Sequence, residues 1–479
     1  MRVNARDSRW HRKKGILVVT CLAGIARASV AIKFRACGAQ PTNPMKHSPL
    51  SPPLIASTAL TRRQALHHGI TGILAAVSAP LFFRSQLLGQ SAPSNRIQLG
   101  VIGNGLIASS HIGGLMGRGD CRIIALCDVS RSAAEHARAR ISQAYGDGST
   151  PAIYSTHEEI LKRQDIDAVF VCVPDHWHAP IANAAMIAGK DVYCEKPLTL
   201  TVREGRILVE TARRCGRVLQ TGTQQRSNAA FRKAAAMVRA KWIGDITGIR
   251  TVLGNFPLPR ILNEQPVPMG FDYDRWLGPT PWRPYNALRV QGNYGGGWRV
   301  YTEYGGRKNG DWGAHHFDII QWALGMDDSG PVEFLPKGWQ DVRFQTHRYD
   351  SGVKVERVER LDHGMIEFKG TKGTIWVGRD DVLVTDPAPL AARPMRAEEP
   401  HLYVSDDHHT DFFNCMRTRQ RPICDVEIGN RTATVCHLNN IAALLRRPIK
   451  WDPRKEEIVG DPVASRLLER PRRAPYTTL

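Results

Sequence analysis

The chain has 479 residues and a formal net charge of +20, a length that suits two or three domains. Residues 1–90 hold thirteen Lys and Arg residues against the single acid Asp7, which leaves +8 for residues 91–479. This remainder includes no basic stripe with interleaved aromatic residues, so the composition argues against nucleic-acid binding.

The N-terminal leader, residues 1–92, contains a pattern that resembles a twin-arginine export signal. Arg62 and Arg63 lie in the sequence TRRQAL, which precedes an uncharged, mostly apolar stretch over residues 69–83. That stretch is too short and too rich in Gly, Ala and Ser for stable membrane insertion. The resemblance implies a partner, the twin-arginine (Tat) export machinery, and a periplasmic or cell-envelope location. If the resemblance is fortuitous, the protein stays in the cytoplasm.

The position of Met45 suggests where translation starts. It lies sixteen residues before Thr61, a usual distance between the start of such a signal and its arginine pair. We therefore expect residues 1–44 to be an extension of the reading frame ahead of the true start.

The ten cysteines form no C-x-x-C pair, and several lie in apolar runs typical of strands, such as Cys127 and Cys172. This pattern predicts buried, unpaired thiols rather than a disulfide framework or a zinc site.

The first predicted strand of the folded part begins at Ile97 and leads into a glycine-rich loop. Residues 97–102 are almost continuously apolar, as expected for a parallel strand covered on both faces. In the G-x-G-x-x-A sequence that follows, Gly103 permits a tight turn and Ala108 permits close packing of the next helix. The residues expected to bind the pyrophosphate of a dinucleotide are Gly103, Asn104, Gly105, Leu106 and Ile107.

A second predicted strand ends at Asp128, at the usual distance after the first glycine. A carboxylate in this position accepts hydrogen bonds from the adenosine ribose and repels a 2′-phosphate. Asp128 therefore favours NAD as the cofactor, whereas the neighbouring Arg131 leaves NADP open.

Strand-like and helix-like segments alternate through the rest of the first domain. Helices are expected over residues 132–145, 158–163 and 181–190, with buried strands over 167–174 and 191–197. Four such alternations with a phosphate-binding loop predict a doubly wound α/β (Rossmann) domain, which we place at residues 95–221.

Glu195, Lys196 and Pro197 lie at the carboxyl end of the last of these strands, the edge where ligands bind in open α/β sheets. Lys196 can donate a hydrogen bond there to a substrate hydroxyl or a ribose. The alternative is an ordinary surface lysine at a strand end.

A second polar cluster lies in the sequence DWGAHHFD, residues 311–318, which opens an apolar run with helical spacing. Asp311 and His315 are four residues apart, so they would project side by side from a helix, where the carboxylate can orient the ring. The alternative is a helix-start cluster without a catalytic role. A metal site is disfavoured, because His316 would point about 100° away and no fourth ligand is evident.

The glycine loop, the EKP sequence and the D-x-G-x-H-x-x-D sequence occur in the order and spacing of the Gfo/Idh/MocA oxidoreductases, which the chain resembles over residues 95–460. The resemblance implies that Lys196, Asp311 and His315 line the pocket over the nicotinamide, with His315 as the acid/base. It also implies an α+β domain with a largely antiparallel open sheet over residues 222–460, often used for homo-oligomerisation, before a tail at 461–479. Further residues placed at the cofactor by this resemblance are Pro174, His178, Glu195 and Lys196.

The resulting hypothesis is a dehydrogenase that transfers a hydride from a hydroxyl of a sugar or polyol to NAD(P). Because soluble NAD is scarce outside the cytoplasm, an exported enzyme would carry a tightly bound cofactor and regenerate it within its cycle. One alternative is an NAD-dependent glycosidase or lyase that oxidises a sugar transiently and eliminates a substituent. Another is a non-catalytic cofactor-binding sensor or scaffold.

Overall fold

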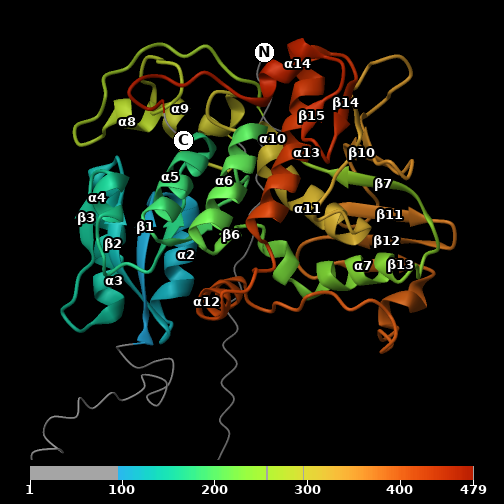
Figure 1. Ribbon diagram of the computed structural model, residues 1–479, viewed down its shortest axis with the longest axis horizontal. Helices are drawn as coiled ribbons and strands as arrows, with labels where there is room; N and C mark the ends of the chain where they lie inside the picture. Colours follow the sequence, from blue (N-terminus) through green and yellow to red (C-terminus); the bar gives the residue numbers. More distant parts are fainter. Residues whose placement is uncertain (1–94, 255–256, 295, 478) are drawn as a thin grey trace, which may run out of the picture. The chain divides into compact units, whose positions relative to one another are not determined.

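The computed structural model describes residues 95–254, 257–294, 296–477 and 479, and within them two β-sheets organise the chain (Figure 1). The expected export signal and the expected start at Met45 lie outside the described residues.

The first sheet has six parallel strands in the order β3-β2-β1-β4-β5-β6. The order reverses between β1 and β4, and the carboxyl ends of the strands on either side of such a reversal form a binding crevice. The strands are β1 (Ile97–Ile102), β2 (Cys121–Cys127), β3 (Ala152–Tyr154), β4 (Ala168–Val171), β5 (Asp191–Cys194) and β6 (Leu219–Thr221).

Helices alternate with these strands and begin at local capping signals. Thr156 and Thr201 each form a capping box with a glutamate three residues later, which fixes the starts of α4 and α6. The alternation confirms the predicted Rossmann architecture. The helices are α2 (Leu106–Met116), α3 (Arg131–Tyr145), α4 (His157–Leu161), α5 (Asp175–Ile187) and α6 (Val202–Cys215).

The second sheet has nine strands in the order β13-β12-β11-β7-β10-β9-β8-β14-β15. Its pairs are antiparallel except for β7 and β10, which run parallel, so the expected largely antiparallel sheet is confirmed. The strands are β7 (Ile246–Val252), β8 (Glu333–Leu335), β9 (Gln345–Arg348), β10 (Lys354–Val358), β11 (Ile366–Gly370), β12 (Gly373–Val377), β13 (Leu383–Asp386), β14 (Ile449–Asp452) and β15 (Glu457–Ile458).

The helical segments of the second part include one long helix, α13, that also packs against α6 of the first part. The segments are η3 (Gln224–Ser227), α7 (Ala229–Arg239), α8 (Tyr273–Leu277), α9 (Ala287–Val290), η4 (Gly297–Val300), α10 (Arg307–Asp311), α11 (Gly313–Leu324), η5 (Ala388–Ala392), α12 (His408–Thr418), α13 (Val426–Leu445), α14 (Pro462–Ser465) and η6 (Arg466–Leu468).

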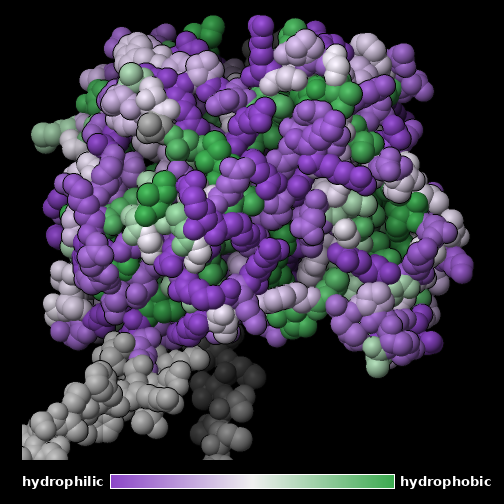
Figure 2. Space-filling model, in the orientation of Figure 1, coloured by the Kyte–Doolittle hydropathy of each residue, from purple (hydrophilic) through white to green (hydrophobic). Residues whose placement is uncertain are grey.

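Polar and charged residues cover much of the face shown in Figure 2, with apolar patches between them. Among the described residues, no helix combines the length and apolarity needed to cross a membrane. The eight cysteines in this part of the chain are unpaired and all but Cys215 are buried, as the sequence predicted.

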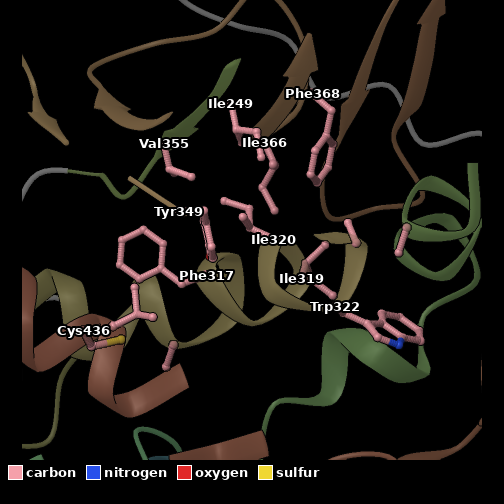
Figure 3. Close-up of a cluster of buried hydrophobic side chains, with 14 of the residues drawn as sticks. Ile249, Phe317, Ile319, Ile320, Trp322, Tyr349, Val355, Ile366, Phe368 and Cys436 are labelled. Atoms are coloured by element: carbon pink, nitrogen blue, oxygen red, sulfur yellow. The ribbon is translucent and has the colours of Figure 1, made fainter. Parts of the chain in front are cut away.

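The largest apolar core lies between the second sheet and the helices α7, α11 and α13. Ile320 of α11 points toward Ile249, Val355 and Ile366 of the sheet, and all four side chains are at most 1% exposed (Figure 3). This packing fixes α11, and with it the cluster of polar residues at the start of that helix, relative to the sheet.

Candidate active site

The glycine-rich loop leaves β1 in the geometry of a dinucleotide-binding turn. Gly103 has a φ of +85°, and a Cβ there would lie 2.6 Å from the carbonyl oxygen of Cys172, so a side chain is excluded. The backbone N–H of Asn104 donates to Asp128 Oδ2 at 2.6 Å, which joins the loop to the end of β2.

The start of α2 suits a pyrophosphate. Its N-cap, Gly105, supplies no side-chain hydrogen bond and the first turn contains no acid, so the first N–H groups stay available to an anion. Asn104 Oδ1 is buried without a hydrogen-bond partner among the described residues, so it is free to accept a hydrogen bond from a ribose hydroxyl. A bound nicotinamide dinucleotide therefore fits the residues present.

Asp128 stands where the adenosine ribose of such a cofactor would lie. Its two oxygens accept hydrogen bonds from the backbone N–H groups of Asn104 and Ser130, at 2.6 and 2.8 Å. Burial raises the pKa of Asp128, and these hydrogen bonds oppose that increase. The nearby Arg131 forms an ion pair with Glu135 at 2.5 Å.

A cavity of about 260 Å³ lies along the carboxyl ends of β1, β2, β4 and β5. The structure brings into its wall all ten residues that the sequence assigned to the cofactor, together with Asp311 from the second part of the chain. These wall residues are Gly103, Asn104, Gly105, Leu106, Ile107, Asp128, Pro174, His178, Glu195, Lys196 and Asp311.

Lys196 and Asp311 form a close ion pair inside this cavity. Lys196 Nζ donates to Asp311 Oδ1 at 2.6 Å, and both side chains are nearly buried. Arg299 Nε lies 3.6 Å from the same oxygen. Burial acts to raise the pKa of Asp311, but the charges of Lys196 and Arg299 outweigh it and hold that pKa below its ordinary value. Asp311 is therefore an ionised group that fixes the lysine ammonium.

His315 differs from the arrangement expected from its spacing. The helix is interrupted at Trp312, so Asp311 ends α10 and His315 belongs to α11. The Asp311 carboxylate accepts a hydrogen bond from Lys196, and no hydrogen bond joins it to His315 within the described ranges. His315 is 4% exposed, lies outside the cavity wall, and its Nδ1 has no hydrogen-bond partner there.

Burial and the charges of Lys196 and Arg379 place the pKa of His315 well below its ordinary value. The ring is therefore neutral near pH 7. Asp318, the last residue of the same motif, accepts two hydrogen bonds from Arg226, both at 2.8 Å, and stabilises the fold.

Two models of one oxidoreductase family match the chain. The model described as "Oxidoreductase family, NAD-binding Rossmann fold" matches residues 97–223. The model described as "Oxidoreductase family, C-terminal alpha/beta domain" matches residues 242–478. The chain belongs to the Gfo/Idh/MocA family. Residues 97–223 therefore have the NAD-binding Rossmann fold of this family.

Individual relatives of this Gfo/Idh/MocA protein have carbohydrate-related names. Inositol 2-dehydrogenase 1 of Saccharopolyspora erythraea is 29% identical over 191 residues, which are 38% of this chain and 54% of that protein. Glycosyl hydrolase family 109 protein 1 of Shewanella sp. (strain ANA-3) is 34% identical over 133 residues, 27% of this chain and 28% of that protein. The chain spans about half the length of the first curated relatives it matches.

Among solved structures, the aldose-aldose oxidoreductase from Caulobacter crescentus has a TM-score of 0.54 with this Gfo/Idh/MocA chain at 19% identity. The similarity covers 74% of this chain and 99% of that one. At this identity the similarity shows a shared fold.

His178 and Glu195 hold neighbouring parts of the Gfo/Idh/MocA site in place. The His178 ring lies between the carbonyl oxygens of Pro197 and Val173, at 2.6 and 2.9 Å, so it fastens the turn after β5 to the end of β4. Glu195 Oε1 accepts a hydrogen bond from His111 Nε2 at 2.9 Å.

A segment of the second part lies over the dinucleotide cavity. We call residues 264–294 and 296–300 the strap. The strap joins the end of β2 through a β-bridge between Ser130 and Phe271. It also joins α4 through an ion pair between Arg275 and Glu158 at 2.8 Å. The strap residues in the cavity wall are Phe271, Arg275, Trp276, Val290, Gly292, Tyr294, Trp298 and Arg299.

Sequence reasoning missed three charged residues of the cavity wall, Asp175, Arg275 and Arg299. Asp175 follows Pro174 directly and starts α5, so its position at a strand end was a usable signal. Its pKa is raised to about 7, chiefly by burial. Arg299 lies in a segment rich in Trp, Tyr and Gly, and no local pattern in the sequence distinguished it.

Proposed function

We propose that the protein is an NAD-dependent dehydrogenase that oxidises a hydroxyl group of a sugar or polyol. The observation that carries this proposal is the Lys196–Asp311 ion pair in the wall of the dinucleotide cavity. An ammonium held there can donate a hydrogen bond to a hydroxyl oxygen while the neighbouring carbon gives up its hydride. The carbohydrate-related names of the curated relatives support this substrate class.

A bound nicotinamide supplies the acceptor for the hydride that leaves the substrate carbon. Lys196 orients the hydroxyl oxygen and stabilises negative charge that develops on it, and Asp311 holds the ammonium in position. His315, the acid/base implied by the family resemblance, is the proposed acceptor of the hydroxyl proton, with Nδ1 unpartnered among the described residues. It lies outside the cavity wall here, and catalytic contacts commonly shorten once substrate is bound. The C–H and O–H bonds break, a carbonyl forms, and the proton stays on the protein until the reverse transfer.

NAD rather than NADP is the proposed cofactor because of Asp128. Its carboxylate is fixed by two backbone hydrogen bonds, and the basic residue beside it, Arg131, is already paired with Glu135. Titration of cofactor-free protein with each dinucleotide tests this point. At least ~10-fold tighter binding of NAD is expected from the like-charge repulsion, and equal or tighter binding of NADP would contradict it.

The strap supports a cofactor that stays bound between turnovers. It covers the cavity and connects to the first sheet by backbone and ion-pair contacts, so the dinucleotide would leave only after these contacts break. Retention suits a cycle that oxidises one sugar and returns the hydride to a second substrate.

The experiment starts with protein purified from cells without added cofactor. Denaturation should release close to one equivalent of NAD(H) per chain, and a sugar or polyol should reduce the bound cofactor, as measured by absorbance at the reduced-nicotinamide band. Free exchange of the cofactor would refute retention. Failure of every polyol and sugar tested to change that absorbance would refute the dehydrogenase and favour the sensor or scaffold alternative.

The second candidate is an NAD-dependent glycosidase, favoured by the 34% identity to glycosyl hydrolase family 109 protein 1. Transient oxidation of a ring carbon acidifies the neighbouring C–H, so a glycosidic substituent can leave before the hydride returns. Product analysis with aryl glycosides separates the two functions, because release of the phenol without net cofactor reduction identifies glycoside cleavage.

Export by the Tat machinery and homo-oligomerisation are also part of the proposal. Cell fractionation with a twin-lysine variant of Arg62 and Arg63 tests export, with retention in the cytoplasm as the expected result. Light scattering on the purified protein tests the oligomeric state, and a monomeric mass would contradict oligomerisation.

A further inference from the structure

Arg299 is a buried cation whose Nε forms a long ion pair with Asp311 but no hydrogen bond. The residue is 9% exposed and lies in the wall of the dinucleotide cavity. Its Nη1 donates to the carbonyl oxygen of Asn293 at 3.0 Å. Its Nε makes no hydrogen bond, and none from Nη2 occurs among the described residues. These two nitrogens form one edge of the guanidinium, the edge that binds a carboxylate through two parallel hydrogen bonds.

The plane of this guanidinium is fixed by aromatic rings. Its carbon lies 4.2 Å from the centre of the Trp298 ring and 5.7 Å from that of Tyr294. Cation–π contacts of this kind limit rotation of the side chain. Arg299 therefore presents its open edge in a preorganised position, and little conformational entropy is lost when an anion binds.

Asp311 does not accept a hydrogen bond from Arg299. The Asp311 oxygen nearest Arg299 Nε is 3.6 Å away, beyond hydrogen-bond distance, and already accepts the hydrogen bond from Lys196 at 2.6 Å. One ammonium and one guanidinium thus share a single close carboxylate, which leaves one positive charge in excess.

Of the other charged groups nearby, the ionised Glu195 interacts with Lys196 and His111, and Arg299 is not among the charges that lower its pKa. Arg379 is close enough that its charge acts on Asp311 and His315, and its Nε is buried without a hydrogen-bond partner in the described part of the chain. Asp175 is the other carboxyl close to Arg299, and burial raises its pKa to about 7, so it is only partly ionised at neutral pH. The surroundings of Arg299 therefore favour an anion.

We infer that the substrate of this site is an acidic sugar, and that Arg299 binds its carboxylate through Nε and Nη2. This inference rests on the proposed sugar oxidation and adds the substrate class. Lys196 would hold the reacting hydroxyl while Arg299 holds the carboxylate on another carbon of the same molecule. Trp298 also lines the cavity, where its ring holds the Arg299 guanidinium.

The test compares matched pairs of neutral and acidic sugars on the holoenzyme. Glucose, galactose and mannose are paired with glucuronate, galacturonate and mannuronate, and binding is measured by calorimetry together with reduction of the bound cofactor. At least one uronate should bind about 10- to 100-fold more tightly than its neutral partner, the range of a charge-assisted bidentate contact. Wild-type binding without any such preference overturns the inference.

Arg299→Gln should reduce this preference to near one by weakening binding of the uronate much more than binding of the neutral sugar. Arg299→Lys should keep part of the preference, because an ammonium retains the charge but not the planar edge. Arg138→Gln, which removes an arginine that forms an ion pair with Glu135 away from the cavity, is the matched control. If the role of Arg299 were only to keep Asp311 ionised, Arg299→Gln would weaken binding of the neutral sugar and of the uronate equally. That result overturns the inference.

Two outcomes separate this inference from the proposed function. Reduction of the cofactor by neutral sugars and uronates alike keeps the dehydrogenase and rejects the acidic substrate. Arg299-dependent binding of a uronate without any cofactor reduction supports the carboxylate site and rejects the dehydrogenase. Preferential binding of sugar phosphates over uronates overturns the carboxylate assignment.

Discussion

Lys196 Nζ lies 2.6 Å from Asp311 Oδ1, although 115 positions separate the two residues in the sequence. This ion pair joins the end of β5 to the end of α10, so the reacting end of the cavity exists only when both parts of the chain are folded together. The nearly buried pair holds the ammonium where a substrate hydroxyl would bind.

Asp311→Asn should lower the rate of bound-cofactor reduction by about 10²- to 10⁴-fold, since the lysine loses the charge that positions it. Lys196→Gln should have a similar effect, and the double variant should lose much less than the product of the two, because the residues act as a unit. Stopped-flow absorbance gives the rates, and the NAD content of each variant is measured as a control. Independent, multiplicative losses would contradict a joint role. Lys241→Gln, which breaks an exposed pair with Asp245, serves as the matched variant.

His315→Asn should lower the same rate by about 10²-fold or more without changing the shape of the pH–rate profile. The shape should persist because the pKa of His315 lies well below 6.5, so the ring is already neutral across pH 6.5–9. Profiles of wild type and variant are compared over this range. If the wild-type pH–rate profile changes slope near pH 6.5 and the profile of the variant does not, then His315 titrates there, contrary to this prediction.

His316→Asn distinguishes the two adjacent histidines. His316 is 1% exposed, and its Nδ1 lies 3.2 Å from Thr251 Oγ1, on the sheet side of α11. We expect a lower melting temperature and a nearly unchanged rate of cofactor reduction. A loss of rate as large as that of His315→Asn, with normal stability, would reverse the assignment.

Phe271→Ala should speed release of the bound cofactor by about 10-fold, because it removes a ring from the cavity wall at the point where the strap pairs with Ser130. Loss of NAD is followed after dilution into a scavenging dehydrogenase. Trp282→Ala is the control, since Trp282 belongs to the same strap but is 59% exposed and lies outside the cavity wall. Equal release from both variants would mean that general loosening, rather than the wall contact, controls retention.

Asp175→Asn should become stabilising relative to wild type as the pH rises from about 4 to about 7. Burial raises the folded-state pKa of Asp175 from 3.8 to about 7, so the folded protein binds more protons than the unfolded chain in this window. Ionisation of the buried group therefore destabilises wild type by up to roughly 4 kcal/mol above pH 7, and asparagine removes that cost. Melting temperatures of both proteins at pH 5, 6, 7 and 8 measure the difference.

Asp350→Asn, at an exposed position, is the control variant measured at the same pH values. If the difference in melting temperature between Asp175→Asn and wild type stays constant from pH 5 to pH 8, Asp175 is ionised throughout this range. It then does not titrate near neutral pH.

Local signals in the sequence were sufficient for the dinucleotide domain, whereas the largely antiparallel second domain was expected only from the family resemblance. The apolar strand at Ile97, the glycines at 103 and 105 and the alternation of strands and helices depend on backbone geometry and period, which neighbouring residues determine. The same reasoning placed Asp128 and Lys196 at strand ends. Since the carboxyl ends of parallel strands share one edge of the sheet, these residues met in one cavity.

Long-range packing decided the rest. Spacing paired Asp311 with His315, but the interruption of the helix at Trp312 and the 2.6 Å contact with Lys196 gave Asp311 a different partner. The position of Arg299 over the dinucleotide cavity depends on a strap that follows β7 by more than ten residues and returns to β2. Charge–charge contacts fall off with distance in space rather than along the chain. The sequence could therefore name the dinucleotide domain and its lysine, whereas the partner of that lysine and the open cation beside it emerged only in the folded protein.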